Sequence, residues 1–171
     1  RIFLDSIPVG SYRITEKNVP SHVILSEIPQ EVYLEAGCTR TVTFFNAVKP
    51  SLTILKRNSI TGDPLSNAKF HIYYGSDNTT TGEINDLGVF TTDESGKITL
   101  TDVNRGWYKL VEESAPKGFG IQGNGVTEFY LEANTSKTVT VDNVPHSALV
   151  VYKYDAKTGK GLEGCRFELR Y

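Results

Sequence analysis

The chain has few of the residues that build metal sites, disulfide scaffolds or catalytic sets. Its 171 residues include three histidines and two cysteines, and methionine is absent. The histidines are scattered and no Ser/His/Asp or Cys/His set recurs, so the sequence predicts no metal, no cofactor and no enzyme that acts on other molecules. Two cysteines cannot build a disulfide scaffold. We expect Cys38 in a turn and Cys165 facing the core, with a bridge between them as a minor alternative.

A strong charge of one sign and long apolar runs are also lacking. The net charge is −2 and the isoelectric point is near 5.9, so the sequence offers no basic surface for nucleic acid or an anionic membrane. It contains no signal peptide, membrane span or wall-sorting sequence, and its first residue, Arg1, is not an initiator methionine. We therefore expect a piece of a longer protein, with no membrane insertion in this segment.

The chain is instead rich in residues that favour strands, with nine tyrosines, eight phenylalanines and no sustained helical period. Alternating apolar residues predict seven short strands, at about 51–57, 68–74, 88–92, 97–101, 106–113, 126–133 and 138–143. The run Gly118-x-Gly120-x-x-Gly123 matches a dinucleotide-binding fingerprint, but no helical pattern follows it, so we expect a loop there. Seven short strands separated by turns are typical of a sandwich, and the predicted fold class is all-β.

The sequence repeats itself at a spacing near 97. Residues 31–56 overlay on 128–153 with a constant offset of 128 − 31 = 97, and residues 1–16 overlay on 97–112 with an offset of 97 − 1 = 96. Such a period is typical of an array of similar domains. We expect tandem sandwiches in three parts: the C-terminal part of a first repeat (1–49), a complete central repeat (50–146) and the N-terminal part of a third repeat (147–171).

Three polar residues of the central repeat interrupt rows of apolar residues that should face the core. Lys56, Glu112 and Asn143 each continue the period-two alternation of an expected strand. Singly, such residues usually reach solvent, pair with a base or form a turn. Because an isolated buried charge costs several kcal/mol, three of them need a mutual explanation. A reaction among them would supply one, and a simple buried Lys–Glu ion pair is the main alternative.

Four motifs of the central repeat carry a family resemblance: Leu52-Thr-Ile-Leu-Lys56, Thr61-Gly62-x-Pro64-Leu65-x-x-Ala68-x-Phe70, Tyr108-x-Leu110-Val111-Glu112-x-x-Ala115-Pro116-x-Gly118-Phe119 and Val141-Asp142-Asn143. Together they resemble the CnaB-type (SpaA-like) domains of Gram-positive pilins and adhesins. The resemblance implies an inverse-immunoglobulin, transthyretin-like sandwich with a spontaneous intramolecular isopeptide bond. Carried over to this chain, the bond would join Lys56 to Asn143, and Glu112 would assist as acid and base.

The resemblance also implies a structural repeat domain of a bacterial stalk, pilus or adhesin, outside the cell at the wall or surface of a Gram-positive bacterium. Its partners would be neighbouring repeats of the same protein and other copies in a fibre. A ligand-binding adhesin that recognises a host surface protein or matrix components stays open as the alternative, with residues 75–87 as its candidate loop.

The two partial repeats hold complementary parts of the polar set. Glu16 and Asn46 lie in the first part, and Lys153 lies in the last. In a lesser alternative, Lys153 of one molecule is joined to Asn46 of the next by an intermolecular isopeptide bond, with Glu16 assisting. The preferred interpretation is an excerpt of a longer array in which each bond stays inside its own repeat.

Overall fold

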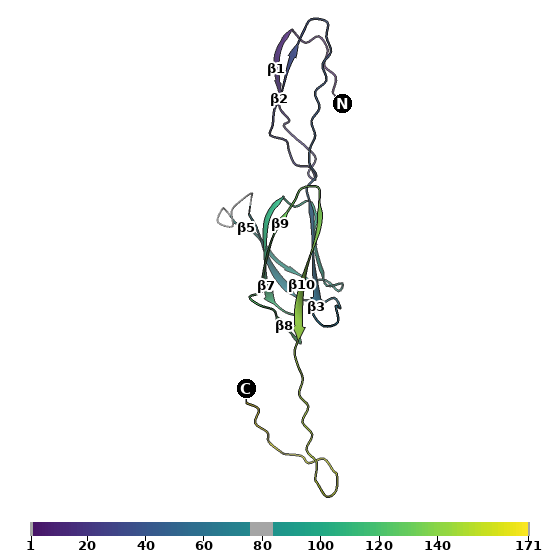
Figure 1. The fold of residues 1–171 in the computed structure, drawn as a ribbon, viewed down its shortest axis with the longest axis vertical. Coiled ribbons are helices and arrows are strands. Elements are labelled where there is room, and N and C mark those ends of the chain that lie inside the picture. Colours follow the sequence, from purple (N-terminus) through teal and green to yellow (C-terminus); the bar gives the residue numbers. More distant parts are fainter. Residues whose placement is uncertain (1, 76–83, 171) are drawn as a thin grey trace.

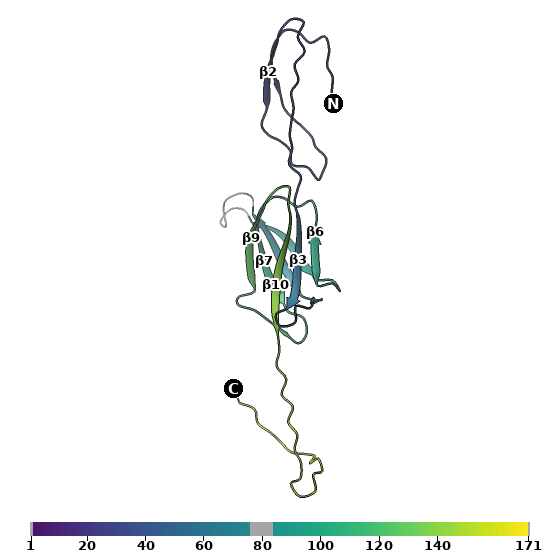
Figure 2. The ribbon, with the colours of Figure 1, turned by 45° about the vertical axis from the view of Figure 1, so that its right-hand side comes forward.

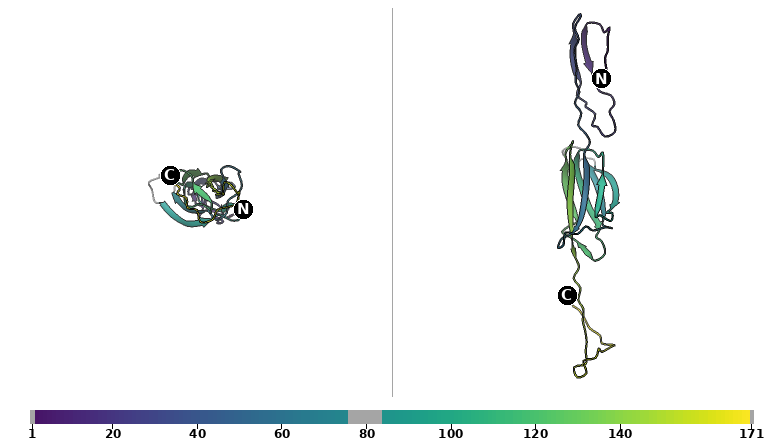
Figure 3. Two further views of the ribbon diagram at one scale, coloured as in Figure 1. Left: turned by 90° about the horizontal axis from the view of Figure 1, so that it is seen from below. Right: turned by 90° about the vertical axis from the view of Figure 1, so that its right-hand side faces the viewer.

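Every regular element is a strand in the part of the chain that the structure, a computed structural model, describes: residues 2–75 and 84–170. Figure 1 shows three parts in line: a two-stranded N-terminal sheet, a central sandwich and a C-terminal segment without strands. Further views keep the N-terminal sheet and the C-terminal segment at opposite ends of the sandwich (Figures 2 and 3). Over the same residues, no helix has the length and apolar character needed to cross a bilayer. The predicted all-β sandwich is confirmed.

Eight strands build the sandwich in the described part of residues 50–146. They are β3 (Ser51–Asn58), β4 (Lys69–Gly75), β5 (Ile84–Thr91), β6 (Lys97–Leu100), β7 (Gly106–Ser114), β8 (Phe119–Ile121), β9 (Val126–Leu131) and β10 (Ser136–Pro145). One sheet has the order β6-β3-β10-β8, and the other has the order β5-β4-β7-β9. The two sheets enclose one apolar core, as sandwich packing requires.

The first and last strands of the sandwich lie side by side. β3 and β10 pair in parallel, β3 also pairs antiparallel with β6, and β10 pairs antiparallel with β8 near its end. β3 is therefore an inner strand, and alternate residues along it face the core. Leu52, Ile54 and Lys56 are the fully buried members of that row.

The second sheet forms the opposite wall of the core. β4 lies between β5 and β7, and β7 pairs with β9. Its inward row on β4 contains Phe70 and Ile72, and its inward row on β7 contains Tyr108 and Leu110, all of them buried. Glu112 continues the row on β7, so the second sheet carries one polar residue into the core.

The segments on either side of the sandwich have little pairing of their own. β1 (Gly10–Ile14) and β2 (Gln30–Leu34) form an antiparallel pair, and residues 146–170 contain the isolated bridge between Tyr154 and Gly161. Residues 2–49 and 146–170 are all described, and none of them is fully buried. Both segments therefore expose the apolar residues that the sequence pattern places in strands.

Two details of the strand prediction are wrong. Residues 119–121, expected to be loop, form β8, because the end of β10 extends far enough to pair with them. β5 begins at Ile84, so part of the expected 75–87 loop is strand. The rest of that loop, residues 76–83, lies outside the described residues.

The two cysteines are free and exposed. The Cys38 amide donates to the Glu35 carbonyl oxygen at 3.3 Å, so this residue follows a turn as expected. The expectation that Cys165 faces a core is wrong, because residues 147–170 have no opposing sheet to pack against. No bridge joins the two thiols.

The outer face of the second sheet carries a charged cluster across three strands. His71 on β4 lies 2.7 Å through Nε2 from Asp86 Oδ1 on β5, and 3.1 Å through Nδ1 from Glu113 Oε1 on β7. Its ring stacks on Tyr73, with the ring centroids 4.4 Å apart. The hydrogen bond to Asp86 raises the pKa of His71, and the bond to Glu113 adds to this effect, against partial desolvation. The doubly protonated imidazolium can donate to both carboxylates.

This raised pKa predicts a loss of stability as the solution becomes alkaline. The contribution of His71 is complete below the pKa of the unfolded chain, and it is lost as the pH rises through the higher folded value. Between about pH 6 and pH 8.5, we expect the denaturation midpoint of the wild type to fall more than that of His71→Gln, which cannot titrate. Parallel midpoint curves for the two proteins would contradict the assigned contacts.

Candidate functional site

Three polar side chains meet inside the core of the sandwich. Lys56 projects from β3 and Asn143 from β10 in one sheet, and Glu112 projects from β7 in the other. Lys56 and Asn143 are 0% exposed and Glu112 is 5% exposed. All three face the core, as their position in the alternating rows predicts.

One oxygen of Glu112 contacts both other side chains. Glu112 Oε2 lies 3.3 Å from Lys56 Nζ and accepts a hydrogen bond from Asn143 Nδ2 at 3.2 Å. The amine and the amide nitrogen are therefore no farther apart than the sum of these two distances. The sequence could place each residue in the core, but only the packing of one sheet on the other brings Glu112 between the two nitrogens.

The parallel pairing of β3 with β10 holds the Lys56 amine beside the strand that carries Asn143. Lys56 is opposite Val141 in the register, and Asn143 lies two residues farther along β10 on the same face. Lys56 Nζ also donates to the Val141 carbonyl oxygen at 3.2 Å. Its contacts with Glu112 and with the Val141 carbonyl oxygen thus hold the amine near the Asn143 amide.

Two polar atoms of the cluster lack a hydrogen-bond partner among the described residues. They are Glu112 Oε1 and Asn143 Oδ1, and both are buried. An unpaired buried polar atom costs about 1–3 kcal/mol, so native cores contain few of them. As a static ion pair with a bystander amide, this cluster would be poorly satisfied.

Burial also prepares the amine. Desolvation lowers the pKa of Lys56, and the attraction and hydrogen bond of Glu112, together with the charge of Asp142, only partly oppose it. Asp142 itself pairs with Arg57, with Nε and Oδ1 3.1 Å apart. Lys56 therefore reaches the neutral amine form more readily than an ordinary lysine does.

A glycine turn fixes the backbone on either side of the amine-bearing residue. The Lys56 amide donates to the Gly96 carbonyl oxygen at 2.8 Å, and the Lys56 carbonyl oxygen accepts from the Leu65 amide at 2.9 Å. Gly96 has a φ of +71°, and a Cβ there would lie 2.8 Å from both the Lys56 carbonyl oxygen and the Leu65 nitrogen. Only glycine fits this approach, and it keeps Lys56 in register.

The structure brings together two of the three equivalents in the partial repeats. Asn46 Nδ2 donates to the two carboxyl oxygens of Glu16 at 2.9 and 2.7 Å, and the Ser26 amide donates to Glu16 at 3.2 Å. Asn46 Oδ1 is buried without a partner in the described part of the chain. Lys153 is exposed in the C-terminal segment, which lies at the opposite end of the sandwich from the N-terminal segment (Figure 1).

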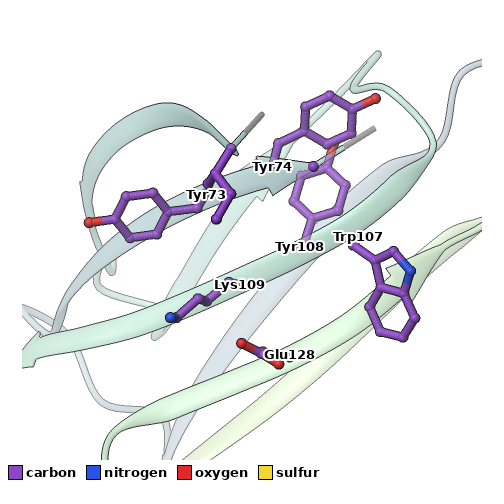
Figure 4. Close-up of a pocket in the computed structure, with 8 residues that line it drawn as sticks. Tyr73, Tyr74, Trp107, Tyr108, Lys109 and Glu128 are labelled. Carbon is purple, nitrogen blue, oxygen red and sulfur yellow. The ribbon is translucent and has the colours of Figure 1, made fainter. Parts of the chain in front are cut away.

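A small aromatic pocket, which the sequence analysis missed, opens beside the start of β7 (Figure 4). It is lined by Tyr73, Tyr74, Gly75, Ile84, Trp107, Tyr108, Lys109 and Glu128. The sequence feature that could have indicated this pocket is Trp107, an aromatic residue in the outward row of β7. The pocket holds about 60 Å³, whereas small-molecule sites usually hold several hundred. The small pocket therefore supports a ligand-binding function only weakly. The buried cluster gives stronger support to covalent chemistry.

A protein-family model described as the SpaA prealbumin-like fold domain matches residues 50–145. No curated protein matches the chain in sequence. Among solved structures, the Bacillus anthracis TIE protein is 24% identical with a TM-score of 0.51, and the alignment covers 83% of this chain and 26% of that one. It shares the fold.

Two pilin structures are also similar. The group B streptococcus pilus 2b backbone protein is 20% identical with a TM-score of 0.49, over 77% of this chain and 52% of its own. A minor pilin of Streptococcus agalactiae is 21% identical with a TM-score of 0.47, over 88% and 66%. The chain thus spans between about a quarter and two thirds of these structures.

The turn beside Lys56 gives a matched pair of substitutions. Gly62 also has a positive φ, of +78°, but a Cβ there would meet nothing within 4 Å. We expect Gly62→Ala to cost about 1–2 kcal/mol, for the left-handed backbone alone. Gly96→Ala should cost clearly more in urea denaturation, because backbone atoms must also move. Equal losses of stability in the two variants would show that the close backbone approach at Gly96 does not hold Lys56 in place.

Proposed function

The chain belongs to the SpaA family of prealbumin-like fold domains, and on this premise we propose that residues 50–146 form a structural domain of a Gram-positive surface pilus or stalk, crosslinked by a self-formed Lys56–Asn143 isopeptide bond. One observation carries the proposal: the amine and the amide contact the same carboxyl oxygen in a buried core. Glu112 is the assisting acid and base.

The reaction begins with transfer of a proton from Lys56 to Glu112. The transfer leaves both groups neutral, which a core of low dielectric constant favours over an ion pair. A half-turn of the Asn143 amide about its Cβ–Cγ bond then presents Oδ1, now unpaired, to the protonated carboxyl. The hydrogen bond from Glu112 makes the Asn143 carbonyl carbon more electrophilic.

The neutral amine then attacks that carbon. A bond forms between Lys56 Nζ and Asn143 Cγ, the bond from Cγ to Nδ2 breaks, and ammonia leaves. Glu112, protonated in the first step, gives its proton to the departing nitrogen and takes one from the attacking amine, so it holds one proton before and after the attack. One neutral secondary amide replaces an amine and a primary amide. The fold itself supplies the positioning that an enzyme would otherwise provide.

The rival interpretation, a permanent buried ion pair, explains less of the geometry. It accounts for the contact between Lys56 and Glu112 and gives Asn143 only the role of a hydrogen-bond donor to Glu112. It also leaves one oxygen of Glu112 and one of Asn143 unpaired in the core. The proposed reaction uses all three residues and consumes the amide whose oxygen is unpaired.

The domain would also act as a mechanical link. The chain enters the sandwich on β3 and leaves it on β10, and the crosslink joins these neighbouring strands. Tension would then pass from residue 56 to residue 143 through the bond, and residues 57–142 would carry no load. The closed loop of 143 − 56 = 87 residues should add about 4–5 kcal/mol by the chain-entropy model for crosslinks.

We place residues 1–49 and 147–171 in neighbouring repeats of the same array, which makes those repeats, and other copies in a fibre at the bacterial surface, the partners of the central domain. The recurrence of strand pairing supports this division. In β1 and β2, Gly10 pairs with Leu34; in β7 and β9, Gly106 pairs with Leu131. These pairs are related by the offsets of 96 and 97 that relate the sequences.

Intact mass tests the crosslink directly. The denatured, reduced, monomeric chain should weigh one ammonia less than its sequence, and peptide mapping should join the peptides that contain Lys56 and Asn143. Lys56→Ala, Glu112→Ala and Asn143→Ala should show the full sequence mass. Lys97→Ala, an exposed lysine on β6, is the control and should keep the loss. A wild-type mass equal to the sequence would refute the reaction.

Single-molecule pulling tests the mechanical role. The wild-type central domain should give no gain in contour length, because the crosslink shields its interior from load. Glu112→Gln, which keeps the side-chain shape but cannot act as the acid, should unfold with the extension of an uncrosslinked domain. Full extension of a wild-type domain whose crosslink has been verified by mass would overturn the proposed load path.

A further inference from the structure

The short linker that leads into β3, residues 48–51, is bound to the sandwich along its backbone. Pro50 is fully buried, and its carbonyl oxygen accepts a hydrogen bond from the Val103 amide at 3.2 Å. The Ser51 amide donates to the Thr135 carbonyl oxygen at 3.0 Å. A proline also fixes its own φ and keeps the residue before it extended. The linker therefore has little freedom to swivel where it enters the sandwich.

Val48, the first residue of the linker, is held between the N-terminal segment and the sandwich. The Ile24 amide donates to the Ala47 carbonyl oxygen at 2.8 Å. The Lys49 amide donates to the His22 carbonyl oxygen, also at 2.8 Å. Val48 is thus the residue of an antiparallel bridge whose own amide and carbonyl groups point away from the N-terminal segment.

Asn134 of the central domain binds both of these groups. The Asn134 amide donates to the Val48 carbonyl oxygen at 2.9 Å, and the Val48 amide donates to Asn134 Oδ1 at 2.6 Å. One asparagine, in the turn between β9 and β10, therefore pairs with the linker as a neighbouring strand would. The N-terminal segment meets the sandwich at this end, where β3 begins (Figure 1).

The backbone conformation at this position does not require an asparagine. Asn134 has a φ of +58°, and its repeat equivalent, at 134 − 97 = 37, is Gly37 with a φ of +71°. Both values lie in the left-handed region, where glycine is free of strain and asparagine is tolerated. Glycine would build the same turn, but it has no side-chain oxygen to offer Val48. The asparagine therefore adds the second hydrogen bond to the linker.

Packing alone does not hold the linker in place. A hollow of about 360 Å³ lies beside it, lined by residues 48–51, Thr101, Asp102 and residues 134–136. Val48 is 46% exposed, and Asn134 is exposed as well. Without the hydrogen bonds of Asn134, the N-terminal segment would have open space into which to tilt.

We propose that Asn134 is a clamp that fixes the preceding repeat on the central domain. The contact surface is the turn between β9 and β10, and its partner is an extended strand that presents the amide and carbonyl group of one residue. This rests on the array of repeats proposed above, but not on the crosslink. The crosslink would carry tension within a domain, whereas the clamp resists bending between two domains.

The same clamp cannot form at the joint after the central domain. At offset 97, Val48 corresponds to Pro145, which has no amide hydrogen to donate. Pro50 corresponds to Ser147, whose φ is not fixed by a ring. The two joints therefore differ in kind, and the clamp is specific to the joint before the central domain.

Amide exchange at Val48, measured by NMR on the full chain, tests the clamp. In Asn134→Gly the turn keeps its conformation, but the Val48 amide loses its acceptor and should exchange about 3–10 times faster, as the loss of one hydrogen bond implies. Asn134→Asp keeps a side-chain oxygen and tolerates the left-handed φ, so it should retain the wild-type rate. Equal rates in wild type and Asn134→Gly would overturn the clamp.

A matched control comes from another turn of the same domain. Asn124 Oδ1 accepts a hydrogen bond from the Val126 amide at 3.1 Å. Asn124→Gly removes this oxygen as Asn134→Gly removes the other, but it should leave exchange at Val48 unchanged. Faster exchange at Val48 in both variants would show a general loosening of the domain and would contradict a specific clamp.

The distance between two spin labels tests the stiffness of the joint. Ser21→Cys and Thr99→Cys place one label on each side of the linker, in a chain that also carries Cys38→Ser and Cys165→Ser; all four positions are exposed. The distance distribution should be narrow in this background and with Asn134→Asp, and broader with Asn134→Gly. A broad distribution in the background chain, or one width for all three, would refute a rigid joint.

The clamp and the crosslink fail separately in these experiments. The intact mass of the same samples reports whether the Lys56–Asn143 bond has formed. Loss of ammonia without the expected effects of Asn134→Gly would overturn the clamp and leave the crosslink standing. The expected effects without loss of ammonia would support the clamp and refute the crosslink.

Discussion

The contact of Glu112 with two nitrogen atoms in a buried core is the constraint on which the rest of the site depends. It exists only because two sheets pack face to face, since Lys56 and Asn143 come from one and Glu112 from the other. Water in this space would solvate the amine and the carboxylate and remove the reason for the proposed proton transfer between them. The apolar rows around the cluster therefore serve the proposed reaction as well as folding.

The parts of this arrangement that follow from local pattern could be predicted from the sequence. Alternation along β3, β7 and β10 turns Lys56, Glu112 and Asn143 inward, because strand geometry allows only two faces. The seven expected strands exist for the same reason. The missed strand, β8, has three residues within a glycine-rich run and forms through its pairing with β10. Such pairing depends on a distant segment, and local alternation does not report it.

The exposed Cys165 shows the same limit of local patterns, because here the pattern predicts burial that the fold does not provide. Its row would face a core in a complete repeat, but burial requires an opposing sheet as well as a strand pattern. Residues 147–170 have the pattern without the sheet, and the described side chains there remain exposed. The shared oxygen of Glu112 and the pocket beside Trp107 likewise arise from contacts between strands far apart in sequence. Periodicity gives the direction of a side chain, and tertiary packing decides what it touches.

The parallel pairing of the first and last strands sets how far each repeat advances. The chain leaves along β10 in the direction in which it entered along β3, so each repeat contributes about one strand length of reach, roughly 30 Å for a strand of ten residues. A fully extended repeat would span about ten times more. In the proposed array, each added domain therefore adds reach, and a crosslink between Lys56 and Asn143 would keep the remaining length of that domain from extending under load.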